Sequence, residues 1–128
     1  MAEFLTPLDI GELGEDHWRL LRPLKYQTDL LTYLQRIITV PGGFETDLES
    51  VPRWLTLAYA VLYGTAHKAS VVHDWLYTGG LYDREKDDAI LYEAILATGQ
   101  PRWKAWMIWS GVRMGGWVAW DAHQRSKN

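Results

Sequence analysis

The stretch SVVHDWLY, residues 70–77, places a histidine beside an aspartate, His73 and Asp74, in an otherwise apolar run. Burying an unpaired carboxylate costs several kcal/mol or changes its protonation state, so the pair is exposed at a helix edge, paired inside the protein, or holding a ligand. A histidine can act as a base near neutral pH, and an aspartate is a hard ligand for cations. On a helix the two side chains point about 100° apart, so we expect them to serve different partners.

Two further aspartates are candidates to join this pair. Asp47 ends PGGFETD, residues 41–47, a glycine-containing loop of the kind that offers backbone carbonyls as ligands. Asp88 lies one turn into a helix predicted over residues 83–99, and the apolar residues three and four positions later turn it toward the core. The connection 78–83 is short, so the helices on either side of it should be neighbours, which could bring Asp88 close to His73.

A structural role explains the same side chains equally well. A His–Asp pair on a helix often belongs to a buried hydrogen-bonding network, and Asp47 can cap the turn that follows it. The charges of DREKDD, residues 83–88, are typical of a solvated first helical turn, with Asp88 as the exception. The residues themselves leave both interpretations open.

The elements that must position these residues divide the chain into a β-like front and a helical back. Alternating apolar residues predict strands over 17–26 and 31–40, and proline and glycine predict a loop over 41–52. Helical periodicity follows over 53–63, 65–77, 83–99 and 101–122. We therefore expect an α+β fold, a small N-terminal antiparallel β unit followed by about four helices, in a single domain over 1–128 (β part about 16–50, helical part about 53–122).

The chain is rich in tryptophan, with eight in 128 residues. Within the helix predicted over 101–122, Trp103, Trp106, Met107, Trp117 and Trp120 share one broad face. A stripe of this kind is usually core, and the glycines between its members permit close packing. We predict that Trp106 and at least one of Trp117 and Trp120 are buried against the helices over 53–63 and 83–99.

Composition excludes several classes of protein. A net charge of −3 argues against strong non-specific binding to nucleic acid. The absence of cysteine excludes disulfides, thiolate zinc sites and cysteine nucleophiles. The first ten residues lack the pattern of a secretory signal peptide, and the apolar runs are too short for a transmembrane span, so we expect neither.

Three ordered motifs resemble the signature of a family of unknown function common in tailed bacteriophages and prophages. The motifs are VPGGFETDLESVPRWL, ASVVHDWLY and REKDDAILYEAILATG, and the resemblance covers about residues 18–120. The positions that match the signature are Phe44, Thr46, Asp47, Ser50, Pro52, His73, Asp74, Tyr77, Arg84 and Asp88. Thr46, Ser50, Tyr77 and Arg84 would then support the site, while Glu49 departs from the small residue that we expect there. The resemblance implies a phage protein, made in the host cytoplasm and carried in the virion if it is structural.

A second, local resemblance is to the secreted phospholipase A2 enzymes, in which a helical H-D-x-x-Y precedes a further aspartate on the next helix. By this resemblance His73 would be the catalytic base, Asp88 its orienting partner and Asp74 a calcium ligand. The loop 42–48, with Asp47, would complete the calcium site. His73 would activate a water molecule, and calcium would polarise an ester carbonyl.

Three functions are consistent with these residues. The first is a virion component, such as a tail or tail-tip protein that binds other virion proteins, with the polar cluster as a structural brace. The second is a calcium-dependent, phospholipase A2-like hydrolase acting on host envelope lipid or a related ester. The third is a small phage effector that binds a host protein through exposed tryptophans. We take the virion component as the leading expectation because it needs the fewest further assumptions.

Overall fold

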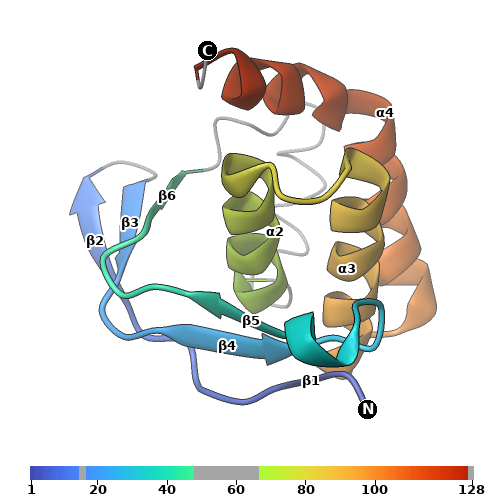
Figure 1. Ribbon diagram of the computed structural model, residues 1–128, viewed down its shortest axis with the longest axis horizontal. Coiled ribbons are helices and arrows are strands. Elements are labelled where there is room, and N and C mark those ends of the chain that lie inside the picture. The colour runs from blue at the N-terminus through green and yellow to red at the C-terminus, as the bar shows by residue number, and fades with distance from the viewer. Residues whose placement is uncertain (15–16, 48–66, 127–128) are drawn as a thin grey trace.

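The structure, a computed structural model, describes residues 1–14, 17–47 and 67–126 (Figure 1). These residues form two small antiparallel sheets followed by three helices, so the expected α+β class is confirmed. The strands are β1 (Glu3–Phe4), β2 (Ile10–Gly14), β3 (His17–Leu20), β4 (Leu24–Gln27), β5 (Ile37–Val40) and β6 (Glu45–Asp47), with a 3-10 turn η1 (Tyr33–Gln35) before β5. The helices are α2 (His67–Gly79), α3 (Arg84–Ala97) and α4 (Arg102–Ser126). The helix predicted over 53–63 lies outside the described residues.

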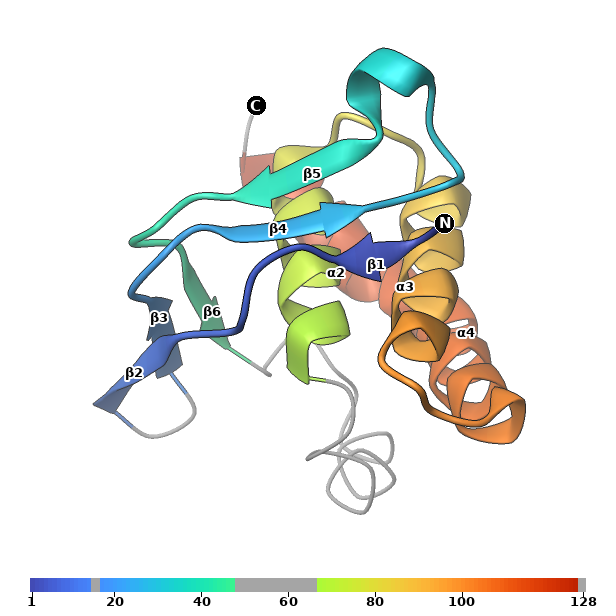
Figure 2. The same cartoon turned by 90° about the horizontal axis from the view of Figure 1, so that it is seen from below.

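The sheets have the strand orders β1-β4-β5 and β2-β3-β6. In the first, Leu24 pairs with Val40 and Tyr26 with Ile38, and all four side chains are buried because they point to the same face. That face packs on α2 and α3, as Figure 2 shows. The predicted alternation of buried and exposed residues along β4 is confirmed.

The strand boundaries differ from the prediction in four ways. The strand predicted over 17–26 is two strands in different sheets, because residues 21–23 around Pro23 interrupt it and proline has no N–H to donate to a ladder. Only 37–40 of the second predicted strand is extended, and the predicted loop 41–52 contains β6. Strands β1 and β2 precede residue 16, where the sequence predicted none; both depend on pairing with β4 and β3.

Helices α2 and α3 form an antiparallel pair joined by a short connection (Figures 1 and 2), as the sequence predicted. Gly80, with a φ of 63°, allows the chain to leave α2 in the left-handed region. Asp83 then caps α3 by accepting a hydrogen bond from the Lys86 backbone N–H at 2.8 Å. This tight connection sets the register of α3 against α2, and with it the position of Asp88.

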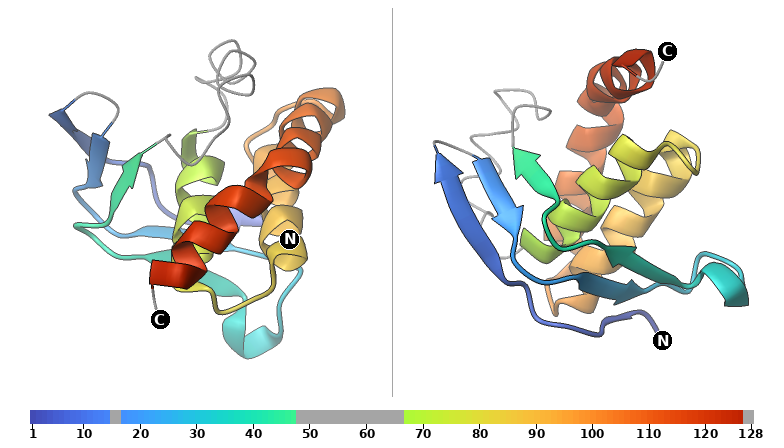
Figure 3. Two further views of the ribbon diagram at one scale, coloured as in Figure 1. Left: turned by 90° about the horizontal axis from the view of Figure 1, so that it is seen from above. Right: turned by 60° about the vertical axis from the view of Figure 1, so that its left-hand side comes forward.

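Helix α4 packs along α3 and then crosses α2 (Figure 3, left), but Trp103 and Trp106 do not form the predicted core. Trp103 and Trp106 are 58% and 59% exposed, so the prediction that Trp106 is buried is wrong. The face of α4 that packs inward instead carries the smaller Ala105, Ile108 and Val112. The side chains of Trp117 and Trp120 lie outside the described residues. No described helix is both long and apolar enough to cross a membrane.

Glu93 on α3 fastens the helices to the first sheet. Its Oε1 accepts hydrogen bonds from the Tyr26 and Thr28 hydroxyls, each at 2.6 Å, and its Oε2 accepts one from the Asp29 backbone N–H at 3.1 Å. Tyr26 and Thr28 are both buried, so their hydroxyls need this acceptor. Burial, and then the hydrogen bond to Glu93, raise the pKa of Tyr26, which keeps its hydroxyl a donor.

We expect Glu93→Ala to lower the free energy of unfolding by about 1–3 kcal/mol, because two buried hydroxyls lose their acceptor. Urea denaturation monitored by circular dichroism measures the change. Glu85→Ala, at an exposed glutamate of the same helix, is the matched control and should cost at most about 1 kcal/mol. Equal losses in the two variants would show that the hydrogen bonds of Glu93 add nothing to the stability beyond the effect of replacing any glutamate of this helix.

Candidate functional site

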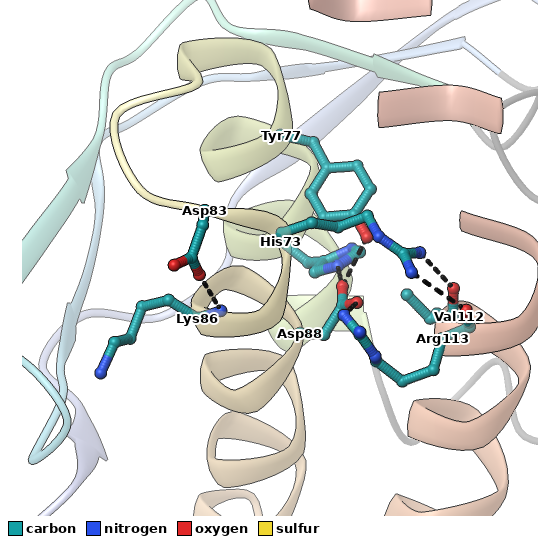
Figure 4. Close-up of polar contacts among 8 residues, drawn as sticks. His73, Tyr77, Asp83, Lys86, Asp88, Val112 and Arg113 are labelled. Carbon is teal, nitrogen blue, oxygen red and sulfur yellow. Dashed lines mark hydrogen bonds and ion pairs between the residues drawn. The ribbon is translucent and has the colours of Figure 1, made fainter. Parts of the chain in front are cut away.

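The candidate site is built around Asp88, a fully buried carboxylate on α3 (Figure 4). Its Oδ1 lies 2.8 Å from His73 Nε2 and accepts a hydrogen bond from the Tyr77 hydroxyl at 2.5 Å. Its Oδ2 accepts a hydrogen bond from Arg113 NH1 at 2.9 Å. The predicted contact between His73 and Asp88 is therefore confirmed, and the site joins all three described helices.

The helical spacing of the partners explains how they converge. His73 and Tyr77 lie four residues apart on α2, so both face α3, with their ring centroids 4.1 Å apart. Arg84 lies one turn before Asp88, and its guanidinium donates to the backbone carbonyls of Val112 at 3.4 Å and Arg113 at 3.2 Å. The predicted supporting residue Arg84 thus holds the segment of α4 that brings Arg113 to the carboxylate.

The environment keeps Asp88 ionised. Burial alone would raise its pKa, but the hydrogen bond and charge of His73 and the hydrogen bonds from Tyr77 and Arg113 lower it below the ordinary value. An ionised carboxylate only accepts hydrogen bonds, so Nε2 of His73 carries the proton that it shares with Asp88. In a neutral imidazole the other ring nitrogen, Nδ1, is then the atom that can accept a proton.

The predicted metal ligand Asp74 makes its hydrogen bond away from the cluster around Asp88. Asp74 Oδ2 accepts a hydrogen bond from the Thr46 hydroxyl at 2.7 Å, which ties α2 to β6. His73 and Asp74 therefore serve different partners, as we expected. Asp47 lies in β6, where its backbone pairs with His17, and its side chain is outside the described residues, as is the whole of Ser50.

Among the residues that the structure describes, no group of three or more histidines, aspartates and glutamates lies close enough together to hold a metal ion. Asp74 accepts a hydroxyl hydrogen bond, and the charge of Asp88 is matched by Arg113. We therefore derive no catalytic step through a metal ion.

Asp87 is a titratable group that the sequence interpretation placed in solvent, and this placement is wrong. Its side chain is fully buried, and within the described part of the chain neither carboxylate oxygen has a hydrogen-bond partner. Burial, and then the charges of Asp88 and Asp83, raise its pKa to about 8. The signal was present in the sequence, because Ile90 and Leu91 follow Asp87 at three and four positions on the same helix face.

We expect Asp87 to make the protein less stable as the pH rises. Between about pH 4, where the unfolded chain loses this proton, and about pH 8, where the folded state loses it, the free energy of unfolding should fall by about 1.4 kcal/mol per pH unit. Asp87→Asn should remove this slope, whereas Glu85→Gln, at an exposed acid two positions away, should retain it. Denaturant titrations at several pH values test this, and equal slopes in wild type and Asp87→Asn would contradict it.

Comparison with known proteins finds one relationship. A family model described as "Protein of unknown function (DUF1353)" matches residues 18–112. This span contains His73, Tyr77, Arg84 and Asp88 and ends one residue before Arg113. No curated protein and no solved structure matches the chain.

Proposed function

We propose a function for this chain, which belongs to the DUF1353 family, a family of proteins of unknown function. The proposal is that His73 is the general base of an ester hydrolase and that Asp88 orients it. The observation that supports it is the 2.8 Å contact between His73 Nε2 and a buried, ionised Asp88. The substrate class is an envelope lipid or a related ester.

The reaction begins at the free nitrogen of His73. Its side chain is 14% exposed, so water can reach the ring. Nδ1 accepts a proton from a water molecule while the water oxygen attacks the ester carbonyl carbon. The tetrahedral intermediate collapses, the bond to the alcohol oxygen breaks, and the alkoxide takes the proton back from Nδ1, giving an acid and an alcohol. Asp88 stays ionised throughout and stabilises the protonated imidazole.

In this mechanism Asp88, Tyr77 and Arg113 are positioning residues. Tyr77 and Arg113 hold the two oxygens of Asp88, so that the carboxylate presents a fixed acceptor to Nε2. Burial, and then the hydrogen bond to Asp88, raise the pKa of Tyr77, so its hydroxyl keeps its proton and remains a donor. A fixed tautomer and ring orientation are what a general base requires.

We expect His73→Ala to lower the rate of ester hydrolysis by at least about 100-fold, because the base is removed. The measurement uses a nitrophenyl ester and, separately, phospholipid vesicles with product analysis by mass spectrometry. Glu85→Gln is the matched control, since Glu85 is an exposed acid on α3 to which no role in the site is assigned. If the wild type hydrolyses none of these esters, or if His73→Ala retains full activity, the hydrolase proposal fails.

The second candidate is a virion component of a tailed phage, such as a tail or tail-tip protein, in which the same cluster is a brace. The observation that favours it is that Asp88 ties α2, α3 and α4 together and leaves neither of its oxygens without a partner. Other virion proteins would be its partners, and the phage origin is part of this proposal. A phage effector that binds a host protein through exposed tryptophans is the third candidate, since Trp103 and Trp106 are exposed.

Thermal and urea melts of His73→Ala separate the brace from the hydrolase. If the cluster is a brace, the variant should lose about 1–3 kcal/mol of stability. The buried carboxylate of Asp88 would still accept hydrogen bonds from Tyr77 and Arg113, but it would have lost its third partner. If the cluster is catalytic, the loss should be small while activity disappears. A stable variant without any loss of activity would contradict both.

Calcium binding by Asp47 and Asp74 stays a prediction, because the Asp47 side chain is outside the described residues. Calcium at about a hundred times its dissociation constant would stabilise the fold by about 2.7 kcal/mol, a melting shift of about 10 °C for a chain of this size. Thermal melts in chelator and then in millimolar calcium or magnesium measure it, and Asp74→Asn should lose the shift. No shift with calcium would contradict the calcium-dependent, phospholipase A2-like form of the hydrolase and favour a structural network around His73 and Asp74.

A further inference from the structure

We infer that the exposed side of the N-terminal half of α4 binds the interface of an anionic lipid bilayer. The surface, here called the α4 stripe, consists of Trp103, Trp106, Met107 and Met114. The two methionines are 42% and 72% exposed, and the exposed fractions of the two tryptophans are larger than half. Figure 3 (left) shows α4 lying across the outside of the fold.

Trp103, Trp106 and Met107 lie within about one turn of the helix, and Met114 lies about two turns further along the same side. The other members of the stripe follow Trp103 at three, four and eleven positions, so their side chains emerge along one line. The opposite side of α4 carries Ala105, Ile108 and Val112, which are buried in the core. The stripe therefore lies outside the face of α4 that packs against the core, and this packing does not depend on it.

The charges beside the stripe have one sign. Arg102 and Lys104 flank Trp103, and the Lys104 ammonium lies 5.6 Å from the centroid of the Trp103 ring. No aspartate or glutamate occurs between Glu93 and Asp121, although the whole chain has a net charge of −3. This local basic charge is complementary to an anionic partner, although the protein as a whole has a negative net charge.

The chemistry of the stripe favours lipid over a protein groove. Tryptophan has a large apolar body and a single N–H donor, which suits the boundary between headgroups and acyl chains. Methionine fills an irregular apolar medium well, and basic residues reach anionic headgroups from the same side. A stripe of this composition needs no complementary shape in a fluid bilayer, and the absence of a membrane-spanning helix among the described residues fits binding at the surface.

The test is sedimentation with vesicles of ether-linked phosphatidylglycerol, compared with ether-linked phosphatidylcholine. These lipids have no carboxylic ester bond, so binding is measured independently of the proposed hydrolase and either proposal can fail alone. The wild type should bind the anionic vesicles at least about tenfold more tightly than the neutral ones, and added salt should weaken the binding. Arg102→Gln with Lys104→Gln should remove most of that preference.

Variants of the stripe provide the second arm. Trp103→Ala with Trp106→Ala should weaken binding to the anionic vesicles at least about tenfold, and Met114→Gln alone should weaken it in the same direction. The matched control is Leu81→Ala, which removes an apolar side chain that is 75% exposed but has Asp83 and Glu85 close by in sequence. Circular dichroism establishes that each variant is folded.

Three outcomes would overturn the inference. They are equal sedimentation of wild type and the double tryptophan variant, an equal loss in Leu81→Ala, and no preference for the anionic vesicles. A dimer seen in velocity sedimentation without lipid, and dissociated by Trp106→Ala, would assign the stripe to a second copy of the chain instead.

Discussion

The folded state depends on one buried charge that must be paired. Moving a carboxylate such as Asp88 out of water costs several kcal/mol, and the cost is offset only when its oxygens are held by donors of good geometry. Here the donors come from two other helices, His73 and Tyr77 from α2 and Arg113 from α4. The requirement fixes how α4 is rotated and how far it is shifted along α3, and Arg84 adds a second fastening at the same level.

The carboxyl of the preceding residue, Asp87, is in the opposite situation. Asp87 is as buried as Asp88, but a helix turns about 100° per residue, so Asp87 faces away from the donors that hold its neighbour. Its pKa rises to about 8 while that of Asp88 falls, and at neutral pH the two adjacent carboxyls differ in charge. Environments that push neighbouring pKa values apart are frequent at catalytic sites, although structural networks produce them as well.

Local sequence signals predicted the parts of the site that depend on short-range geometry. The caps and glycines around 79–83 predicted the α2–α3 pair, and that pair was enough to predict the contact between His73 and Asp88. The strands were harder because they are only two to five residues long and exist through partners distant in sequence, as β1 and β4 show.

Arg113 and Trp106 show a second limit of the sequence. Periodicity along α4 states which residues share a face, but it does not state which face the rest of the protein covers. The side of α4 that packs against the core is the one with the smaller residues, so Trp106 is exposed. Arg113 donates to the carboxylate of Asp88, 25 positions earlier in the sequence. Nothing in the spacing around Arg113 indicated that partner.

The order of the helices in the sequence has a consequence for the order of folding. A chain leaving the ribosome exposes α2 and α3 before α4, so Asp88 meets its two α2 partners before Arg113 reaches it. Until α4 docks, the oxygen of Asp88 that Arg113 will hold remains open to water. The docking of α4 is therefore the step that expels water from the cluster, and the same event completes the site.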